Sequence, residues 1–196
     1  HQCNEDIALM RTIPGMTIIN PADDVEARQA VESAINYVGP VYMRFGRLAV
    51  PVFNDKNTYK FELGKGVVLR DGTDVTIVAT GLMVYEALEA SKTLADEGIS
   101  ARVVNIHTIK PLDTELICRC ANDTGVIVTV EEHSIIGGLG SAVAEAVTGS
   151  CPVPVVRVGV NDEYGCSGPA VELLKKFGLC AENIVAKTKE AVKLKK

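Results

Sequence analysis

Hydrophobic residues recur at two spacings along this chain, and the alternation between them predicts an α/β fold. Apolar residues at every third or fourth position are typical of amphipathic helices, whereas short uninterrupted apolar runs are typical of buried strands. Helices are expected over residues 5–13, 25–38, 83–97, 113–121, 139–147, 169–177 and 181–194. Strands are expected over residues 16–19, 41–45, 66–70, 75–80, 101–106, 126–130 and 153–158. Strands that alternate with helices favour a mostly parallel sheet.

Residues at the ends of these segments support the helix assignments. Asp23 or Asp24 can cap the second helix and Asp113 the fourth, because a carboxylate oxygen accepts free amide hydrogens of a first helical turn. Gly98 follows the third helix, where glycine supplies the left-handed conformation that ends many helices. These signals predict where three of the helices begin or end.

The dipeptide Asp71-Gly72 separates two predicted strands and is typical of a tight hairpin turn. We therefore expect residues 66–70 and 75–80 to pair as a hairpin. The strand over residues 66–70 would then be the antiparallel member of an otherwise parallel sheet.

The pattern divides the chain into two units joined by a polar segment. Residues 1–53 hold two strands joined by a helix, an arrangement that implies parallel pairing. Two strands are too few for a stable sheet, so this unit is expected to be the C-terminal half of a larger α/β domain. Residues 54–63 are the expected linker, and residues 64–196 are expected to form a compact α/β domain.

Composition and charge exclude several classes of protein. The 196 residues carry a formal net charge of −5, and both nucleic acids and anionic membranes require a basic face. Aromatic residues make up only 5% of the chain and Trp is absent, which argues against stacking of bases or sugars on aromatic rings. No apolar run approaches the roughly 20 residues that span a bilayer, and we expect no signal peptide.

Cysteine and histidine usage points to a reducing compartment and away from a metal site. The six cysteines include no C-x-x-C pair, and the three histidines are scattered along the chain. A disulfide framework or a structural zinc site would need paired residues at fixed spacing. We therefore expect reduced thiols, no metal site and a cytoplasmic location.

Three residues are candidates for substrate binding. Arg44 and Arg47 lie in V-Y-M-R-F-G-R, at the end of a predicted parallel strand, where open α/β sheets bind ligands. A guanidinium group suits a phosphate or a carboxylate, although a surface arginine can also simply pair with a nearby acid. His1 can hydrogen-bond or exchange protons near neutral pH, although a terminal histidine is more often a solvated side chain or the remnant of a tag.

Two further groups of residues could bind or react. The loop Gly137–Gly140 opens a helix, so its amides could bind an anion, although the tight turn and close helix–sheet approach that glycine allows are the favoured explanation. Glu131, Glu132 and His133 end the preceding strand and could be catalytic, line a solvated rim or contact another subunit. These residues alone do not reveal a reaction.

Several segments together resemble the transketolase family of thiamine diphosphate-dependent enzymes. The family's pyrimidine-binding domain, just after its histidine-glutamine motif, is similar to the opening H-Q-C-N-E-D-I-A-L-M-R-T-I-P-G-M-T-I-I-N-P-A-D. Its C-terminal domain is similar to G-K-G-V-V-L-R-D-G-T-D-V-T-I-V-A-T-G, H-T-I-K-P-L-D and V-E-E-H-S-I-I-G-G-L-G-S-A-V-A-E. The resemblance implies a partial pyrimidine-binding parallel-sheet domain, followed by a three-layer α/β domain with a mostly parallel five-stranded sheet.

The ending V-G-V-N-D-E-Y-G-C-S-G-P-A-V-E-L-L-K-K-F-G-L resembles transketolase, and in particular the separate C-terminal subunit of split transketolases. The resemblance implies transfer of a two-carbon ketol unit from a ketose phosphate to an aldose phosphate. It matches His1 with the histidine that binds substrate hydroxyls and the developing oxyanion. It matches Arg47 with the arginine that binds the substrate phosphate, and it places Arg44 nearby as a further substrate-binding residue.

The resemblance also implies what lies outside this chain. The family's glutamate and aromatic residue that contact the aminopyrimidine precede the position of His1, and another domain or subunit holds the diphosphate and Mg²⁺. We therefore expect no cofactor-binding or metal-binding residues here, and no activity without the N-terminal subunit or domain. A homodimer and sugar phosphate substrates are the other expected partners.

Two alternatives remain open on the sequence. One is part of a 1-deoxyxylulose-5-phosphate synthase, which uses pyruvate and glyceraldehyde 3-phosphate and shares the Arg-x-x-Arg arrangement of Arg44 and Arg47. The other is a non-catalytic dimerisation or regulatory module whose loop Gly137–Gly140 binds a small anion.

Overall fold

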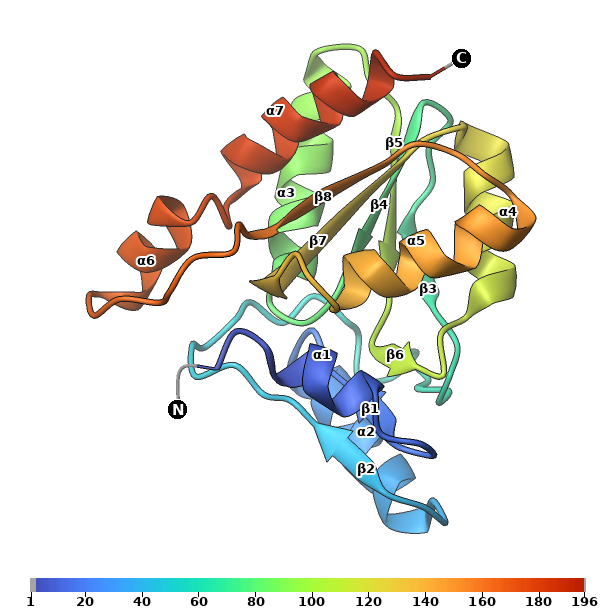
Figure 1. The fold of residues 1–196 in the computed structure, drawn as a ribbon, viewed down its shortest axis with the longest axis vertical. Helices are drawn as coiled ribbons and strands as arrows, with labels where there is room; N and C mark the ends of the chain where they lie inside the picture. Colours follow the sequence, from blue (N-terminus) through green and yellow to red (C-terminus); the bar gives the residue numbers. More distant parts are fainter. Residues whose placement is uncertain (1–2, 196) are drawn as a thin grey trace.

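The structure is a computed structural model that describes residues 3–195. Two β-sheets run through the described chain, one of three strands and one of five (Figure 1). The small sheet lies with the N-terminal helices, and the large sheet lies between two layers of helices that the rest of the chain supplies. The predicted α/β fold class, with a mostly parallel five-stranded sheet, is confirmed.

The N-terminal unit has the predicted order of helix, strand, helix and strand. Its elements are α1 (Asp6–Arg11), β1 (Thr17–Ile19), α2 (Asp24–Asn36) and β2 (Val41–Met43). Strands β1 and β2 pair in parallel, as a crossover helix requires. Asp23 caps α2 as predicted, because its Oδ1 accepts the backbone N–H of Glu26 at 2.9 Å.

The small sheet gains a third strand that the sequence analysis missed. Strand β6 (Thr108–Lys110) pairs antiparallel with β1, which gives the order β2-β1-β6. The sequence pattern predicts only a connection between a strand and a helix over this segment. Three residues are too short to show a periodicity, and their pairing depends on a strand about 90 positions away in the sequence. The third strand of the small sheet therefore comes from the second half of the chain.

The large sheet combines five strands in the order β3-β5-β4-β7-β8. They are β3 (Val67–Arg70), β4 (Val75–Ala79), β5 (Ala101–Asn105), β7 (Ile127–Ser134) and β8 (Val155–Val160). All neighbours are parallel except β3, which runs antiparallel to β5 at the edge. The central strand β4 is buried along its whole length, as expected for a strand with a layer of helices on each face.

The predicted hairpin between β3 and β4 is wrong. Strand β4 has β5 and β7 as its neighbours, and β3 pairs with β5 instead. At Gly72 an added Cβ would lie 2.4 Å from backbone atoms of Ala101 and Arg102. Gly72 therefore packs against the backbone at the start of β5 and does not close a hairpin. This close approach of the two backbone segments leaves no room for a side chain, which explains the glycine.

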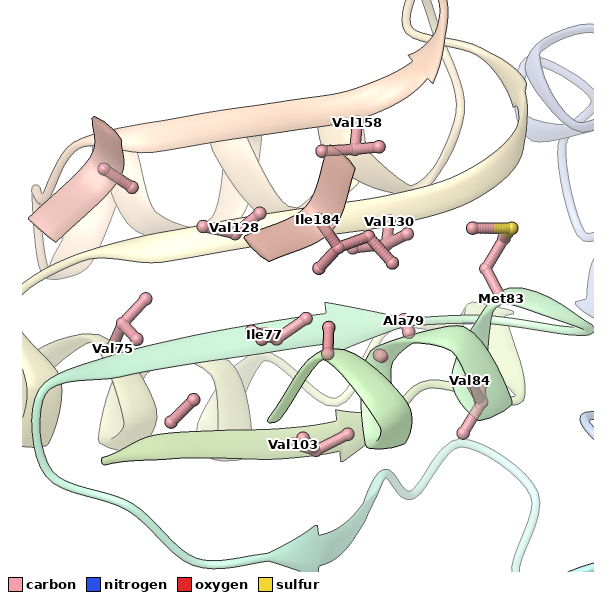
Figure 2. Close-up of a cluster of buried hydrophobic side chains, with 14 of the residues drawn as sticks. Val75, Ile77, Ala79, Met83, Val84, Val103, Val128, Val130, Val158 and Ile184 are labelled. Carbon is pink, nitrogen blue, oxygen red and sulfur yellow. The ribbon is translucent and has the colours of Figure 1, made fainter. Parts of the chain in front are cut away.

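Helices cover both faces of the large sheet and bury its two cores. One face carries α3 (Met83–Asp96) and α7 (Ala181–Val192), and the other carries α4 (Thr114–Thr124) and α5 (Leu139–Ser150) (Figure 1). Alternate side chains of β4 point to opposite faces, so Val75 and Ile77 pack beneath α3 and α7 (Figure 2) while Val78 packs on the other side. The predicted caps are confirmed: Asp113 accepts from the first turn of α4, and Gly98 follows α3 in the left-handed conformation.

After β8 the chain runs out along one side of the molecule to the short helix α6 (Ala170–Lys176) before it returns to α7 (Figure 1). The helices within residues 3–195 are all too short or too polar to cross a membrane. The six cysteines lie in this described part of the chain and are free.

Candidate functional site

Strand β2 brings two arginines to the edge of the small sheet. The backbone N–H of Arg44 donates to the carbonyl of Ile19 at 2.8 Å, which extends the pairing of β2 with β1 by one residue. Arg47 follows three positions later, on a segment that has left the sheet. Both arginines therefore lie just beyond the end of a parallel strand, as the sequence pattern predicted.

The guanidinium group of Arg44 is held by two carboxylates from different parts of the fold. Its Nε lies 2.9 Å from Oδ2 of Asp6 in α1, and its Nη1 lies 3.2 Å from Oε2 of Glu132 in β7. Tyr42 donates its hydroxyl to the same Asp6 oxygen at 2.8 Å, and burial raises the pKa of Tyr42 to about 12. Only 13% of the Arg44 side chain is exposed, so this cation links the N-terminal unit to the large sheet.

Arg47 is exposed, and among residues 3–195 no carboxylate pairs with it. It lines a groove of about 730 Å³. The lining combines charged side chains with apolar side chains from α6 and the turn after it, among them Asp6, Arg44, Glu132, Leu173, Leu174 and Phe177. A guanidinium group beside such a groove can bind a phosphate or carboxylate through two parallel hydrogen bonds.

His1 lies outside the described residues, so its role stays a prediction. Cys3 and Asn4 line the same groove as Arg47. The carbonyl of Asn4 accepts the backbone N–H of Ser134 at 2.7 Å, which fixes this end of the described chain against β7. The described chain therefore begins at the groove.

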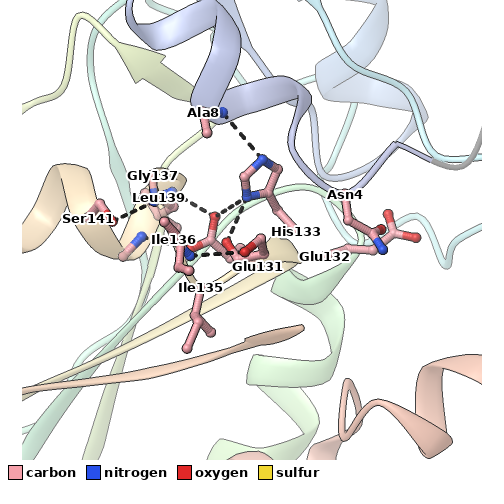
Figure 3. A network of polar contacts seen from close by, with 12 residues as sticks. Asn4, Ala8, Glu131, Glu132, His133, Ile135, Ile136, Gly137, Leu139 and Ser141 are labelled. Carbon is pink, nitrogen blue, oxygen red and sulfur yellow. Dashed lines mark hydrogen bonds and ion pairs between the residues drawn. The ribbon is translucent and has the colours of Figure 1, made fainter. Parts of the chain in front are cut away.

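A buried carboxylate occupies the glycine loop before α5. Oε2 of Glu131 accepts the backbone N–H of Leu139 at 2.6 Å, and Oε1 accepts that of Gly140 at 2.8 Å (Figure 3). The N–H of Gly137 donates to the hydroxyl of Ser141. Burial raises the pKa of Glu131 to about 7, while the two N–H bonds favour its ionised form. These amides bind a carboxylate of the chain itself, which corrects the interpretation of the loop as a site for a free anion.

The other residues at the end of β7 are also occupied within the fold. His133 is fully buried; its Nδ1 lies 2.7 Å from the carbonyl oxygen of Ser134, and its Nε2 accepts the N–H of Ala8 at 3.3 Å. Glu132 pairs with Arg44. The solvated rim that the sequence analysis left open is therefore excluded for His133, which lies in the contact between β7 and α1.

A second buried carboxylate, which the sequence analysis missed, joins α2 to the linker and the large sheet. Glu26 accepts hydrogen bonds from the hydroxyl of Tyr59, from Nδ2 of Asn105 at 2.8 Å and from the N–H of Ala22 at 2.6 Å. Burial raises the pKa of Glu26 to about 7 and raises that of Tyr59 above its ordinary value. Two sequence signals were available: Glu26 stands three positions after the N-cap Asp23, which is the spacing of a capping box, and it lies four positions before Ala30 on the same buried face of α2.

Within residues 3–195 no group of three His, Cys, Asp or Glu side chains could hold a metal ion together. The groove instead offers one unpaired cation, Arg47, among the described residues. This set of side chains suits the anionic end of a substrate, and it does not suit a diphosphate bound with a divalent metal.

Two family models match the chain. Residues 64–184 match the transketolase C-terminal domain, and residues 1–52 match the transketolase pyrimidine-binding domain. The two matches follow each other in the order that the sequence resemblance indicated.

Individual relatives extend this similarity. The chain is 47% identical over 195 residues to the 6-deoxy-6-sulfo-D-fructose transketolase subunit SqwH of Clostridium sp. (strain MSTE9), a match that covers 100% of this chain and 60% of that protein. It is 39% identical over 188 residues to 1-deoxy-D-xylulose-5-phosphate synthase 1 of Geobacter sulfurreducens, which covers 93% of this chain and 29% of that protein.

A solved structure described as a split gene transketolase, inactive beta4 tetramer, superposes with a TM-score of 0.94 at 49% identity. The match covers 100% of this chain and 63% of that one. The chain therefore spans about three fifths of the length of the transketolase subunits that it matches.

Proposed function

This chain belongs to the transketolase family of thiamine diphosphate-dependent enzymes, and from that premise we propose that it is the C-terminal part of a split transketolase. The proposed reaction is transfer of a two-carbon ketol unit from a ketose phosphate to an aldose phosphate. The proposed partners are an N-terminal subunit, which would bind the cofactor and Mg²⁺, and a second copy of this chain. The tetramer in the description of the solved relative supports self-association.

One observation supports the proposal most directly: of two arginines on the same strand end, only one is free. Arg44 is neutralised by Asp6 and Glu132, whereas Arg47 is exposed at the groove. In our proposal Arg47 binds the phosphate of the substrate and Arg44 shapes the groove wall beside it. His1 would hydrogen-bond the substrate hydroxyls and the oxyanion that develops during the reaction.

Thiamine diphosphate, when the complete enzyme holds it, supplies the carbanion-stabilising chemistry of two-carbon transfer. The residues of this chain would bind and orient the sugar. Arg47 would hold the phosphate at one end of the groove, and this contact would fix how far the reacting carbons reach from it. Because the groove also has apolar walls from α6, it would exclude water around the bound sugar.

The full-length protein, assembled with its N-terminal subunit, thiamine diphosphate and Mg²⁺, provides the test. We expect Arg47→Ala to raise KM for phosphorylated substrates by about 10- to 150-fold, because a charge-assisted bidentate contact contributes about 1.5–3 kcal/mol. The matched control is Arg119→Ala, which removes an exposed arginine of α4. An unchanged KM in Arg47→Ala would contradict the assignment of the phosphate site.

Two variations of the assay separate the alternatives. Release of CO₂ from pyruvate with glyceraldehyde 3-phosphate would indicate the synthase reaction, which the similarity to the Geobacter synthase keeps as the second candidate. A donor that ends in a sulfonate instead of a phosphate tests the sulfosugar named for the Clostridium relative, because a guanidinium group binds both oxyanions. An assembled protein without activity on any of these substrates would favour a non-catalytic module.

A further inference from the structure

The first turn of helix α1 lacks a cap from its own sequence. The first amides of a helix have no partner inside the helix, and a side chain at the N-cap position usually accepts one of them. The N-cap residue of α1 is Glu5, which makes no side-chain cap bond; its carboxylate accepts the N–H of Asn4 instead. Ala8, the third residue of the helix, therefore needs an acceptor from elsewhere.

His133 supplies that acceptor from the other unit. Its Nε2 lies 3.3 Å from the backbone nitrogen of Ala8, and its Nδ1 lies 2.7 Å from the carbonyl oxygen of Ser134 (Figure 3). A backbone N–H can only donate and a carbonyl can only accept, so these two contacts assign the hydrogen of the neutral ring to Nδ1; the backbone of Glu5 is a further acceptor near the ring. Oε2 of Glu131 lies 3.7 Å from the same Nδ1. Both nitrogens of this buried imidazole are thus engaged in one tautomer.

The surrounding contacts hold α1 in the same place. The N–H of Ser134 donates to the carbonyl of Asn4 at 2.7 Å. Arg11, in the last turn of α1, donates to the carbonyl of Gly137 at 2.7 Å and to Glu145 at 2.6 Å. Gly137 and Ala8 approach so closely that a Cβ at Gly137 would lie 2.6 Å from that of Ala8. Among the described residues, His133 is the one side chain that accepts a backbone N–H from the first turn of α1, whereas Arg44 and Tyr42 hold the same turn through the side chain of Asp6.

We propose that His133 is a positioning residue of the groove: it caps helix α1 in its neutral Nδ1–H form and so holds the segment over residues 3–8 that lines the groove. The large sheet then takes part in the site through β7, although its own side chains carry out no chemical step. The consequence for catalysis rests on the proposed function, whereas the capping contact does not.

Two substitutions separate capping from packing. In His133→Gln the side-chain amide reaches the place of Nε2 and can accept from Ala8. In His133→Asn the shorter amide reaches only the place of Nδ1, so it keeps the contact to Ser134 and loses that to Ala8. Hydrogen–deuterium exchange of peptides from α1, measured on the full-length protein, reads the contact directly.

We expect amide exchange in α1 to accelerate by about fivefold in His133→Asn, the effect of losing one hydrogen bond, and to stay near the wild-type rate in His133→Gln. Exchange in the core helix α3 serves as the reference and should not change in either variant. Equal acceleration of amide exchange in both variants would overturn the proposal, whether it is confined to α1 or occurs throughout the protein. Amide exchange at the wild-type rate in both variants would also overturn it. The ring ¹⁵N shifts of His133 should show the Nδ1–H tautomer, and the Nε2–H tautomer would also overturn it.

The assembled enzyme provides a separate readout. His133→Asn is expected to lower kcat by about fivefold and to leave KM for the phosphorylated substrate unchanged, because Arg47 lies on a different segment. Rescue of kcat in His133→Gln supports the positioning role, and equal kcat in the two variants contradicts it. A wild-type assembly without activity would refute the proposed function and leave the exchange result as the test of the cap.

Discussion

At the scale of single residues, burial and partners give sequence neighbours different roles. Glu131 is fully buried and caps α5, whereas Glu132 turns to the other face of β7 and pairs with Arg44. Successive side chains of a strand point to opposite faces, so adjacent acids meet different surroundings. Arg44 and Arg47 differ for a related reason, because only Arg44 is still paired with the sheet. The residue types are evident from the sequence, but their partners are not.

His107 is the residue whose environment predicts a pH dependence of stability. It is fully buried between β5 and β6, its Nδ1 lies 2.9 Å from Oγ1 of Thr108, and its ring centroid lies 4.3 Å from that of Phe61. Burial lowers the pKa of His107 to about 4. Between about pH 6.5 and 4 the unfolded chain therefore binds a proton that the folded chain does not, and the free energy of unfolding falls as the pH falls.

As the pH falls from 6.5 to 4, we expect the free energy of unfolding to fall less in His107→Leu than in the wild type, by up to about 3 kcal/mol. Urea unfolding at a series of pH values measures this difference. The raised pKa values of Glu26 and Glu131 act in the opposite direction, but they act in both proteins and cancel in the comparison. Thr108→Val removes the hydrogen-bond partner and keeps the imidazole, so it should retain the wild-type slope. Identical slopes for wild type and His107→Leu would rule out His107 as the source.

At the scale of elements, some helix ends follow local signals, whereas α1 and α5 take an acceptor for their first turn from another element. Asp23 and Asp113 cap α2 and α4 through amides three positions ahead, so the pattern is readable in the sequence. Helix α5 has no side chain of its own at the N-cap, and its acceptor, Glu131, comes from the preceding strand eight residues before Leu139. A cap of this kind requires the strand and the helix to be already packed together.

Substitution by alanine is expected to have opposite effects on stability at two glycines, the N-cap Gly138 and Gly149 in the last turn of α5. A Cβ at Gly138 would lie 2.0 Å from Oε2 of Glu131 and 2.7 Å from Nδ1 of His133, two atoms that are held in place by their hydrogen bonds. At Gly149 a Cβ would meet nothing within 4 Å. Gly138→Ala should lower the free energy of unfolding by about 2–3 kcal/mol, and Gly149→Ala should raise it by about 0.5–1 kcal/mol.

The urea midpoints of the two alanine variants check this prediction against the wild type. Helix propensity favours alanine at Gly149, inside α5, whereas Gly138 is the N-cap, where alanine is a poorer residue than glycine, so both the local preference and the clash lower stability there. A stable Gly138→Ala would mean that Glu131 does not cap α5 as described.

At the scale of the whole molecule, the N-terminal unit and the large sheet are joined by strand pairing, an ion pair and a buried hydrogen bond as well as by the linker. Strand β6 completes the small sheet, Arg44 pairs with Glu132, and Glu26 bonds Asn105 of β5. Because these contacts lie on several sides of the N-terminal unit, its groove residues are positioned by the large sheet as much as by their own strands.

The side chains of the described residues also predict whether this polypeptide binds the cofactor without its partner subunit. We expect the polypeptide of residues 1–196 to show no saturable heat with thiamine diphosphate and Mg²⁺ in calorimetry, because residues 3–195 offer no set of metal ligands. The control is the full-length protein mixed with its N-terminal subunit, which should bind both. Saturable binding to residues 1–196 alone would show that this part of the chain holds a cofactor site of its own.

The sequence by itself determined nearly every helix and strand, three of the helix ends and the family, and it singled out Arg44 and Arg47. These properties depend on residues within about four positions of one another or on the order of short motifs, both of which are visible along the chain. Only the tertiary structure decided that β3 pairs with β5 instead of β4, that β6 joins the small sheet, and that Arg47 is free while Arg44 is paired. Those outcomes depend on which residues meet across tens of positions, and hydrophobic burial selects among such contacts only when the whole chain is packed.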